Sequence, residues 1–463
     1  MKKLTFLFLL YLGKFISLLI RLCGFGQASN FPGKIVFLFQ KDFLRHFKLK
    51  ANSKIILISG TNGKSTTCGF VANILKTSGY KVFYNKSGAN LLTGIITAFC
   101  HYSNLLGRLN YDYIILETDE ATLPLITQEI NPNVIAITNL FRDQLDRFGE
   151  LDTTAKLIEK GINNTKDTTI ILNADDVRVS SIKTKNKKVY YGLNFENISN
   201  QSMTNNKWLL DPEEVTLCPD CNSSLIFTKK FLAHLGDYKC PKCNFKRPLI
   251  DFIGQDFKSD NWTSKFDVLS SAFKIHKQNF FIKLIGIYNV YNAICAIAIV
   301  KSLNAASALQ IQKGFESYST IFGRAEKIKV KNKTCWIYLI KNPTGTTEVL
   351  KTLKDLPNAR FLIALNDKLA DGRDVSWIWD ARFDLLQNHE KDIYVSGKRA
   401  HDMALRLKYA NVSEGMLKIN ENIVKATKQA IMDLKPEETL YILPTYTVLL
   451  EMQRKGISKG VKQ

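Results

Sequence analysis

Short apolar runs, separated by helical patterns and polar clusters, mark the central part of the chain. They lie at Lys54–Ile58, Tyr113–Leu116, Val134–Ile137 and Thr168–Leu172. Runs of this length, rich in Ile, Val and Leu, are typical of strands in a buried parallel sheet. The pattern therefore predicts an α/β fold, in which polar residues at the carboxyl ends of the strands mark the ligand-binding edge.

A second set of strand-like runs lies in the last third of the chain, again with helical patterns between. These runs are Cys335–Ile340, Phe361–Leu365, Ile393–Val395 and Leu440–Leu443. They predict a second α/β domain. We expect an N-terminal helix and basic linker over residues 1–50, a central α/β domain over 51–325 and a C-terminal α/β domain over 326–463. The length of 463 residues fits two or three domains, because domains average about 150 residues.

The first 26 residues predict an apolar helix. Lys3, Lys14 and Arg21 are spaced by 11 and 7 residues, so at about 100° per residue they form one narrow basic stripe. Such a helix can lie in a membrane interface with its cations toward lipid phosphates. It can equally pack on the domain behind it, and a true membrane span is a third alternative. A signal peptide is disfavoured because Lys14 interrupts the apolar stretch.

Composition narrows the classes of protein. Hydrophobic residues make up 45% of the chain and charged residues 23%, which excludes a largely disordered chain. No uninterrupted apolar run reaches the roughly 18–20 residues of a clean membrane span, which excludes a polytopic membrane protein. The net charge of +22, from 64 Lys and Arg against 42 Asp and Glu, favours nucleic acid, a phospholipid surface or a phosphorylated substrate as partner.

A glycine loop between the first strand and a helical pattern predicts a phosphate-binding site. Gly60 and Gly63 let backbone N–H groups approach phosphate oxygens, and the helix N-terminus favours negative charge. Lys64 is expected to reach the β- and γ-phosphates of a bound nucleotide. The predicted phosphate-binding residues are Gly60, Thr61, Asn62, Gly63, Lys64, Ser65 and Thr66.

The same loop predicts a Mg²⁺ site. A hydroxyl of Ser65 or Thr66 is the expected metal ligand, and Glu117, which follows a neighbouring strand, is a second candidate. The alternative for Glu117 is membership of a solvated acidic cluster.

Four of the nine cysteines form two Cys-x-x-Cys pairs, Cys218 with Cys221 and Cys240 with Cys243. Two such pairs with 18 residues between them are the spacing of a four-cysteine zinc site. Two disulfides or four idle thiols are the alternatives. We expect structural Zn²⁺, a reducing compartment and a zinc ribbon at about 212–250 that interrupts the central domain.

Motifs along the chain resemble those of the Mur ligases. They are GTNGKST at 60–66, TNLFRDQLDRFGE at 138–150, LNADD at 172–176, GIYNVYNA at 286–293 and FGRAE at 322–326. The resemblance implies a Mur ligase-type central P-loop ATPase domain with the zinc ribbon inserted, and a C-terminal Rossmann-like α/β domain. It also implies an enzyme that uses ATP to activate a carboxylate as an acyl phosphate for attack by an amine.

Departures from the usual Mur motifs point to one branch. Gln144 stands where a histidine is usual, Tyr288 precedes Asn289 in place of another histidine, and no Asp lies four residues ahead of the Asn-Pro pair at 342–343. The remaining motifs resemble the MurT family, the Mur-ligase-like subunits of lipid II isoglutaminyl synthases. They include FPGK at 31–34, KNPTG at 341–345, NDKLADGRDVSWIWD at 366–380 and LPTYTVLLEMQRK at 443–455.

This resemblance implies ATP-dependent amidation of the α-carboxylate of D-glutamate in the lipid II stem peptide, giving D-isoglutamine. Ammonia would come from a glutaminase subunit of the class I amidotransferase type, in a heterodimer. None of the nine cysteines has glycine at both −2 and +2, which a glutaminase nucleophile of this type requires, so a partner is expected. The implied location is cytoplasmic and peripheral, at the inner face of the bacterial cell membrane.

The resemblance also implies roles for individual residues. Asp374, our first choice, or Asp371 would complete the catalytic triad of the glutaminase. The alternatives are an Asp-Gly turn at Asp371 and, for Asp374, a capping role or an ion pair with Arg373. Asn289 and Asn292 would contact the adenine or ribose. Arg324 would approach the nucleotide phosphates, or else form an interdomain salt bridge.

Two other functions remain as alternatives. One is an amino-acid-adding Mur ligase or folylpolyglutamate-type ligase, which the missing Asp and Gln144 disfavour. The other is a zinc-ribbon nucleic-acid-binding protein, suggested by the +22 charge. That hypothesis leaves the phosphate loop unexplained, and we expect no nucleic acid partner.

Overall fold

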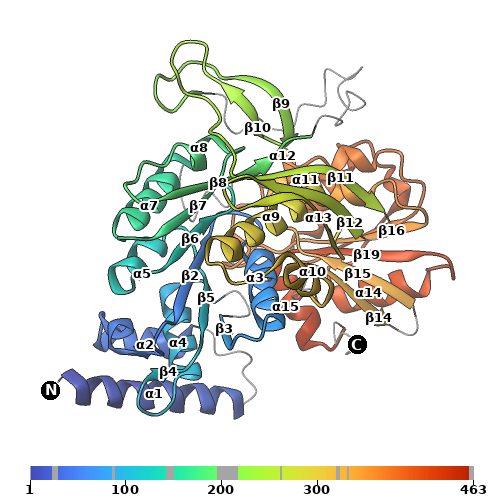
Figure 1. The fold of residues 1–463 in the computed structure, drawn as a ribbon. Helices are drawn as coiled ribbons and strands as arrows, with labels where there is room; N and C mark the ends of the chain where they lie inside the picture. The colour runs from blue at the N-terminus through green and yellow to red at the C-terminus, as the bar shows by residue number, and fades with distance from the viewer. Residues whose placement is uncertain are drawn as a thin grey trace. The chain divides into compact units, whose positions relative to one another are not determined.

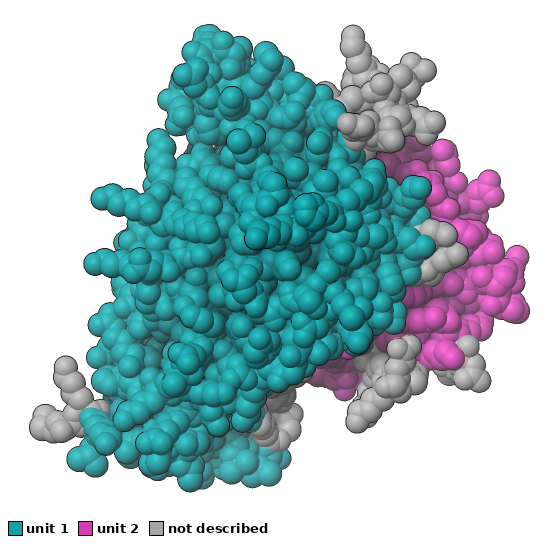
Figure 2. All heavy atoms as spheres, in the orientation of Figure 1, with its two compact units in different colours: residues 1–140, 151–206, 215–318 teal, residues 141–150, 207–214, 319–463 magenta. Residues whose placement is uncertain are grey.

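The structure is a computed structural model that describes residues 2–22, 30–85, 89–141, 151–195, 217–260, 263–319, 324–330 and 333–457. The chain divides into two compact units (Figure 2). Unit 1 comprises residues 1–140, 151–206 and 215–318, and unit 2 comprises 141–150, 207–214 and 319–463. The main boundary between the two units lies between residues 318 and 319, close to the expected domain boundary at 325/326. Residues 1–50 belong to unit 1.

Unit 1 is built on a nine-stranded sheet with the order β13-β12-β11-β8-β7-β6-β2-β5-β3 (Figure 1). Strands β11 to β3 run parallel along this order, while β12 is antiparallel to both of its neighbours, β11 and β13. The strands are β2 (Lys54–Ser59), β3 (Val82–Tyr84), β5 (Tyr113–Glu117), β6 (Val134–Ile137), β7 (Thr169–Asn173), β8 (Lys188–Leu193), β11 (Phe252–Asp260), β12 (Thr263–Ser270) and β13 (Ile275–Ile282). All four strand runs expected in this region are confirmed, as β2, β5, β6 and β7.

Helices cover both faces of this sheet. Phe99 of α4, Ile126 of α5 and Ile158 of α7 share a core with Leu57 of β2, whereas α3, α9 and α10 pack together. Helix α9 is buried along almost its whole length. The helices are α1 (Lys2–Leu22), α2 (Phe31–Phe39), α3 (Lys64–Thr77), α4 (Leu92–Tyr102), α5 (Leu123–Glu129), α7 (Leu151–Asn163), α8 (Val177–Ser180), α9 (Ile287–Ser302) and α10 (Ala308–Glu316).

The N-terminal helix is part of the core of unit 1. Phe6, Leu9 and Leu10 of α1 are buried in the same hydrophobic cluster as α4 and the sheet. The expected basic stripe does not face outward as a whole, because Lys14 Nζ donates to the Ser103 carbonyl oxygen at 2.6 Å. Burial of this face draws Lys14 against the protein, and the side chain of Arg21 lies outside the described residues.

Among the described helices, α1 is the one that is long and apolar enough to cross a membrane by length and composition. Only 28% of its apolar window is buried.

The ribbon is a hairpin inserted between β8 and β11. Its strands β9 (Ile226–Leu232) and β10 (Leu235–Lys239) are antiparallel. The start of the expected interval, 212–216, lies outside the described residues.

Unit 2 contains a six-stranded sheet with the order β14-β15-β19-β16-β17-β18. All neighbours are parallel except β14 and β15, which confirms the Rossmann-like C-terminal domain and its four expected strands. The elements are β14 (Arg324–Val330), β15 (Lys333–Tyr338), β16 (Ala359–Ala364), β17 (Ile393–Ser396), β18 (Leu417–Ile419), β19 (Thr439–Pro444), α11 (Pro343–Leu353), α12 (Trp377–Asp380), α13 (Ala400–Lys408), α14 (Ile423–Met432) and α15 (Tyr446–Arg454).

Candidate nucleotide and metal sites

The glycine loop joins β2 to α3 at the carboxyl edge of the sheet. Gly60 and Gly63 have φ values of 116° and 85°, in the region that favours glycine. A Cβ atom at Gly63 would lie 2.0 Å from Asn292 Oδ1, and one at Gly60 would lie 2.4 Å from Thr138 Oγ1. Both backbone angle and space therefore require glycine, and the loop takes the tight form that a phosphate cradle needs.

Neighbouring strand ends hold the loop in place. The Thr61 N–H donates to the Asn139 carbonyl oxygen at 2.8 Å, and the Asn62 N–H donates to Asn139 Oδ1 at 2.9 Å. Thr138 Oγ1 donates to the Asn62 carbonyl oxygen at 2.7 Å. Sheet register explains this arrangement, because β6, which pairs with β2, ends immediately before Thr138. The predicted loop residues are thus fixed from an adjacent strand.

Lys64 is buried at the start of α3 and forms an ion pair with buried Glu120, with Nζ and Oε1 3.0 Å apart. It also contacts the carbonyl oxygens of Gly60 and Thr61. A buried ammonium needs such compensation. The sequence prediction missed Glu120. The sequence did show that Glu120 belongs to an acidic cluster after β5. It could not show that Glu120 pairs with Lys64, because the two residues are 56 positions apart.

The candidate Mg²⁺ ligands lie beside the loop. Ser65 Oγ donates to Glu117 Oε2 at 2.6 Å, and both residues are buried. Asn85 holds Glu117 from the other side, because Asn85 Oδ1 accepts the Glu117 N–H and Asn85 Nδ2 donates to the Glu117 carbonyl oxygen. Thr66 is buried in the same first turn. Hydroxyl and carboxylate oxygens are hard ligands that suit Mg²⁺.

Two asparagines of α9 approach this site. Thr67 Oγ1 donates to Asn292 Oδ1 at 3.5 Å, at the limit of a hydrogen bond. Asn289 Nδ2 donates to the Ile285 carbonyl oxygen at 2.8 Å and Asn289 Oδ1 accepts from Asn292 at 3.4 Å. Both asparagines are buried. Arg324 is the first residue of β14, but its side chain lies outside the described part of the chain. Residues 142–150, which include Gln144, also lie outside it.

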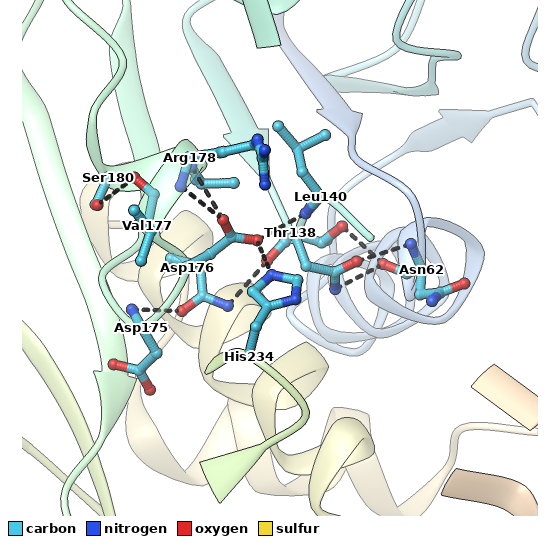
Figure 3. Close-up of polar contacts among 12 residues, drawn as sticks. Asn62, Thr138, Leu140, Asp175, Asp176, Val177, Arg178, Ser180 and His234 are labelled. Atoms are coloured by element: carbon cyan, nitrogen blue, oxygen red, sulfur yellow. Dashed lines mark hydrogen bonds and ion pairs between the residues drawn. The ribbon is translucent and has the colours of Figure 1, made fainter. Parts of the chain in front are cut away.

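Asp176 connects the ribbon to the strand ends around the loop (Figure 3). Its carboxylate accepts from the Arg178 and Val179 N–H groups, which caps α8, and from the Leu140 N–H at 2.7 Å. His234, in the turn of the ribbon hairpin, places Nε2 3.6 Å from Asp176 Oδ2, and both side chains are buried. The ribbon thus rests on the segment that supports the nucleotide loop.

Asp175 supplies a second attachment for the ribbon. Its Oδ1 accepts from Arg247 Nε at 2.8 Å and its Oδ2 accepts from the Tyr291 hydroxyl at 2.6 Å. Asp175 is fully buried, so these charged and polar partners offset the loss of its hydration. The sequence did not predict that Arg247 and His234 attach the ribbon to Asp175 and Asp176, because both contacts join segments far apart in the sequence.

The four predicted cysteines come together at the base of the hairpin. Their Sγ atoms all lie within 4.8 Å of one another. The closest approaches are 3.5 Å between Cys218 and Cys243 and 3.4 Å between Cys221 and Cys240. Zinc–sulfur bonds of about 2.3 Å in a tetrahedron place sulfurs a little under 4 Å apart. Four thiolates at these separations fit Zn²⁺ and leave no position for water.

The two aspartates of the DGRDVSW segment differ in environment. Asp371 is buried, and its carboxylate accepts from the Thr447 N–H at 2.7 Å and from the Thr447 hydroxyl. Burial raises the pKa of Asp371 above its ordinary value. Asp374 is exposed, and its Oδ1 accepts from the Ser376 N–H at 2.8 Å. Asp371 therefore serves the packing of α15, and Asp374 lies at the surface.

Two family models match the chain. One is described as the Mur ligase middle domain and matches residues 58–219, and the other is described as MurT ligase C-terminal and matches residues 339–449. The first covers the nucleotide loop, and the second covers Asp371 and Asp374.

Curated relatives match almost end to end. The chain is 35% identical over 440 residues to the MurT subunit of lipid II isoglutaminyl synthase (glutamine-hydrolyzing) from Streptococcus pneumoniae, covering 94% of each chain. It is 34% identical to the subunit of the same name from Staphylococcus aureus, covering 92% of each.

Solved structures share the fold. A pseudomurein peptide ligase type C from Methanothermus fervidus aligns with a TM-score of 0.65 and 22% identity, covering 90% of this chain and 80% of that one. MurF from Acinetobacter baumannii aligns with a TM-score of 0.65 and 15% identity, covering 92% and 80%.

Proposed function

The chain belongs to the MurT family, and from this premise we propose that it is the ATP-dependent ligase subunit of a lipid II isoglutaminyl synthase. The observation that carries the proposal is the match to the Streptococcus pneumoniae subunit of that name, which spans 94% of both chains at 35% identity. The glycine loop supports the proposal, because a phosphate cradle with a buried lysine is suited to binding ATP.

The proposed reaction amidates the α-carboxylate of D-glutamate in the lipid II stem peptide. A carboxylate oxygen attacks the γ-phosphorus of ATP, ADP leaves and an acyl phosphate forms. The nitrogen of ammonia then attacks the acyl carbon, phosphate leaves and one proton is lost, which gives D-isoglutamine. Phosphorylation is needed because a carboxylate is a poor electrophile, and phosphate is a far better leaving group than oxide.

We assign the residues of unit 1 to ATP. The backbone of Gly60 to Gly63 and the N-terminus of α3 receive the phosphates, and Lys64 exchanges its bond to Glu120 for the β- and γ-phosphate oxygens. Ser65, Thr66 and Glu117 would hold Mg²⁺, which neutralises phosphate charge when bound. Asn289 and Asn292 are assigned to the adenine or ribose, and Arg324 to the nucleotide phosphates.

Ammonia would come from a glutaminase subunit in a heterodimer, with residues 326–463 as the partner-binding domain. Cysteine at the centre of a Gly-x-Cys-x-Gly turn does not occur in the sequence, so the nucleophile must be supplied by a partner. We assign Asp374, rather than Asp371, as the third member of the partner's triad. Its carboxylate is exposed, whereas the carboxylate of Asp371 is buried against Thr447.

The proposed substrate is attached to a lipid, so the protein would work in the cytoplasm as a peripheral protein at the inner face of the cell membrane. Cys218, Cys221, Cys240 and Cys243 would hold structural Zn²⁺ in the ribbon.

One assay tests the proposal. The chain is incubated with its glutaminase, ATP, Mg²⁺, glutamine and lipid II, and the product is analysed by mass spectrometry. Replacement of a hydroxyl by an amino group lowers the product mass by about one dalton, and ATP hydrolysis should match product. Addition of an amino acid, with the corresponding mass increase, would instead identify an amino-acid-adding ligase.

A further inference from the structure

The outward face of α1 is apolar along its whole length. Large exposed apolar side chains at helical spacing form a surface that we call the N-terminal apolar face: Leu4, Phe8, Tyr11, Phe15, Leu18 and Leu22. Phe8 is 66% exposed and Phe15 is 57% exposed. A continuous row of large apolar side chains is unusual on a water-facing helix and marks an interaction surface.

A neighbouring turn continues this surface. Leu105 and Leu106 are exposed at the tip of the turn from Asn104 to Gly107. A Cβ atom at Gly107 would lie 2.6 Å from a ring carbon of Phe6, so the turn is seated against α1. Two leucines at an exposed turn tip are uncommon, because such positions favour polar residues.

The opposite face of α1 fixes the helix in place. Phe6, Leu9 and Leu10 are buried in the core of unit 1, and α2 and α4 lie between α1 and the sheet (Figure 1). A helix that crossed a bilayer would lose these contacts. The fold therefore holds α1 flat against unit 1, with its apolar face outward, as in helices that lie in the plane of a membrane interface.

The positive charge of the N-terminal segment indicates which partner binds the N-terminal apolar face. Residues 1–50 contain nine Lys and Arg but a single acidic residue, Asp42, which lies 3.4 Å from His46. Arg45 and Lys50 pair with Glu129 and Asp112, and the remaining cations outnumber the acidic residues of this segment. Lys3 and Lys34 are exposed on α1 and α2. So strong an excess of cations repels a second copy of the same surface but attracts the phosphates of anionic lipids.

We propose that the N-terminal apolar face is a membrane-docking surface that inserts into the interface of an anionic phospholipid bilayer, with the surrounding lysines and arginines on lipid phosphates. Docking requires neither ATP nor lipid II, so it stands apart from the proposed reaction. It would hold the active site beside a lipid-anchored substrate.

Vesicle flotation of the full chain tests this inference. The wild type should bind phosphatidylglycerol vesicles at least tenfold more strongly than phosphatidylcholine vesicles, and high salt should weaken that binding. Phe8→Asp/Phe15→Asp should reduce binding to phosphatidylglycerol vesicles at least tenfold. The matched control, Leu249→Asp/Leu309→Asp, adds the same charge at positions that are 94% and 65% exposed elsewhere in unit 1, and it should bind like the wild type.

A second variant, Leu105→Asp/Leu106→Asp, repeats the test outside α1 and should also reduce binding. Circular dichroism and amidation of detergent-dispersed lipid II check that each variant is folded. Wild-type protein that fails to float with either vesicle, or folded variants that float as well as the wild type, would overturn the inference. Light scattering that shows a dimer lost in Phe8→Asp/Phe15→Asp, without vesicle binding by the wild type, would assign this face to a second copy instead.

Discussion

At the scale of single residues, the ion pair between Lys64 and Glu120 is the central feature of the candidate nucleotide site. It holds the buried lysine at the start of α3, with Nζ and Oε1 3.0 Å apart. A phosphate that enters the loop competes with Glu120 for the same ammonium. The Lys64 ammonium is therefore already positioned at the loop to bind a phosphate.

Replacing Lys64 with methionine should lower the rate of ATP-dependent amidation at least about 100-fold. Loss of one electrostatic group at a reacting phosphate typically costs about 10²–10³ in kcat, and Lys64→Met also leaves the Glu120 carboxylate buried without its cation. The rate of ADP release in the complete assay measures the effect. The control is Lys76→Met, at the exposed end of the same helix, which should retain wild-type activity. Full activity in Lys64→Met would remove the loop from the reaction.

The two aspartates should show opposite effects on stability and on activity. Asp374→Asn should lower glutamine hydrolysis by the complex at least about 100-fold, because a triad carboxylate orients and stabilises a histidinium. It should change the free energy of unfolding by less than about 1 kcal/mol, since its bond to Ser376 is exposed.

Asp371→Ala should do the reverse and destabilise unit 2 by about 1–3 kcal/mol, because the Thr447 N–H loses its buried acceptor. Urea denaturation and glutaminase assays measure the two properties separately. If Asp371→Asn abolishes glutamine hydrolysis while Asp374→Asn does not, the assignment moves to Asp371.

At the scale of elements, the ribbon is a support for the carboxyl edge of the sheet. Its hairpin places His234 against Asp176, and Asp176 accepts from the Leu140 N–H next to the strand end that holds Asn62. The inserted segment therefore stabilises the nucleotide loop through a chain of buried contacts. Its own core is small, because Tyr238 of the ribbon is buried against Val177 of α8, with three partly buried side chains around it (Leu225, Phe227 and Phe245). A metal is therefore the expected source of rigidity.

Removal of zinc should loosen this support. Cys221→Ser, or treatment with a chelator, should lower the thermal midpoint by several degrees and weaken ATP binding, since a structural zinc site stabilises its fold directly. Asn244→Ser, an exposed change in the same turn as Cys243, is the control and should leave both quantities unchanged. Elemental analysis should find one zinc per chain. A metal-free protein with an unchanged midpoint would contradict the zinc assignment.

At the scale of the whole molecule, the N-terminal helix is both part of a core and part of a surface. Phe6, Leu9 and Leu10 pack inward, and the N-terminal apolar face points outward. The described helix α1 is thus packed into the core of unit 1.

Deletion of residues 2–22 should destabilise unit 1 strongly. Full burial of each large apolar side chain contributes about 1.5–3 kcal/mol, and α1 buries three of them in the shared core. Chemical denaturation should show a lower midpoint, and Leu10→Ala should reproduce about 2–5 kcal/mol of the loss. Phe8→Ala, on the exposed face, should cost less than about 0.5 kcal/mol. An unchanged midpoint after deletion would mean that α1 is dispensable for folding.

The sequence by itself determined the features that local patterns encode. Apolar runs predicted eight strands of the two sheets, the glycine spacing predicted the loop at 60–66, and the two Cys-x-x-Cys pairs predicted the cluster of four thiols. Each of these depends on residues a few positions apart, or on a motif whose spacing is itself the signal.

Only the tertiary structure decided how distant segments meet. It paired Lys64 with Glu120, set His234 against Asp176, buried Asp371 while leaving Asp374 exposed, and turned Lys14 toward Ser103. These contacts follow from strand register and helix packing, which depend on the whole core. Helical spacing gave α1 an apolar face and a basic stripe, but which face met water was decided by what packed beneath it.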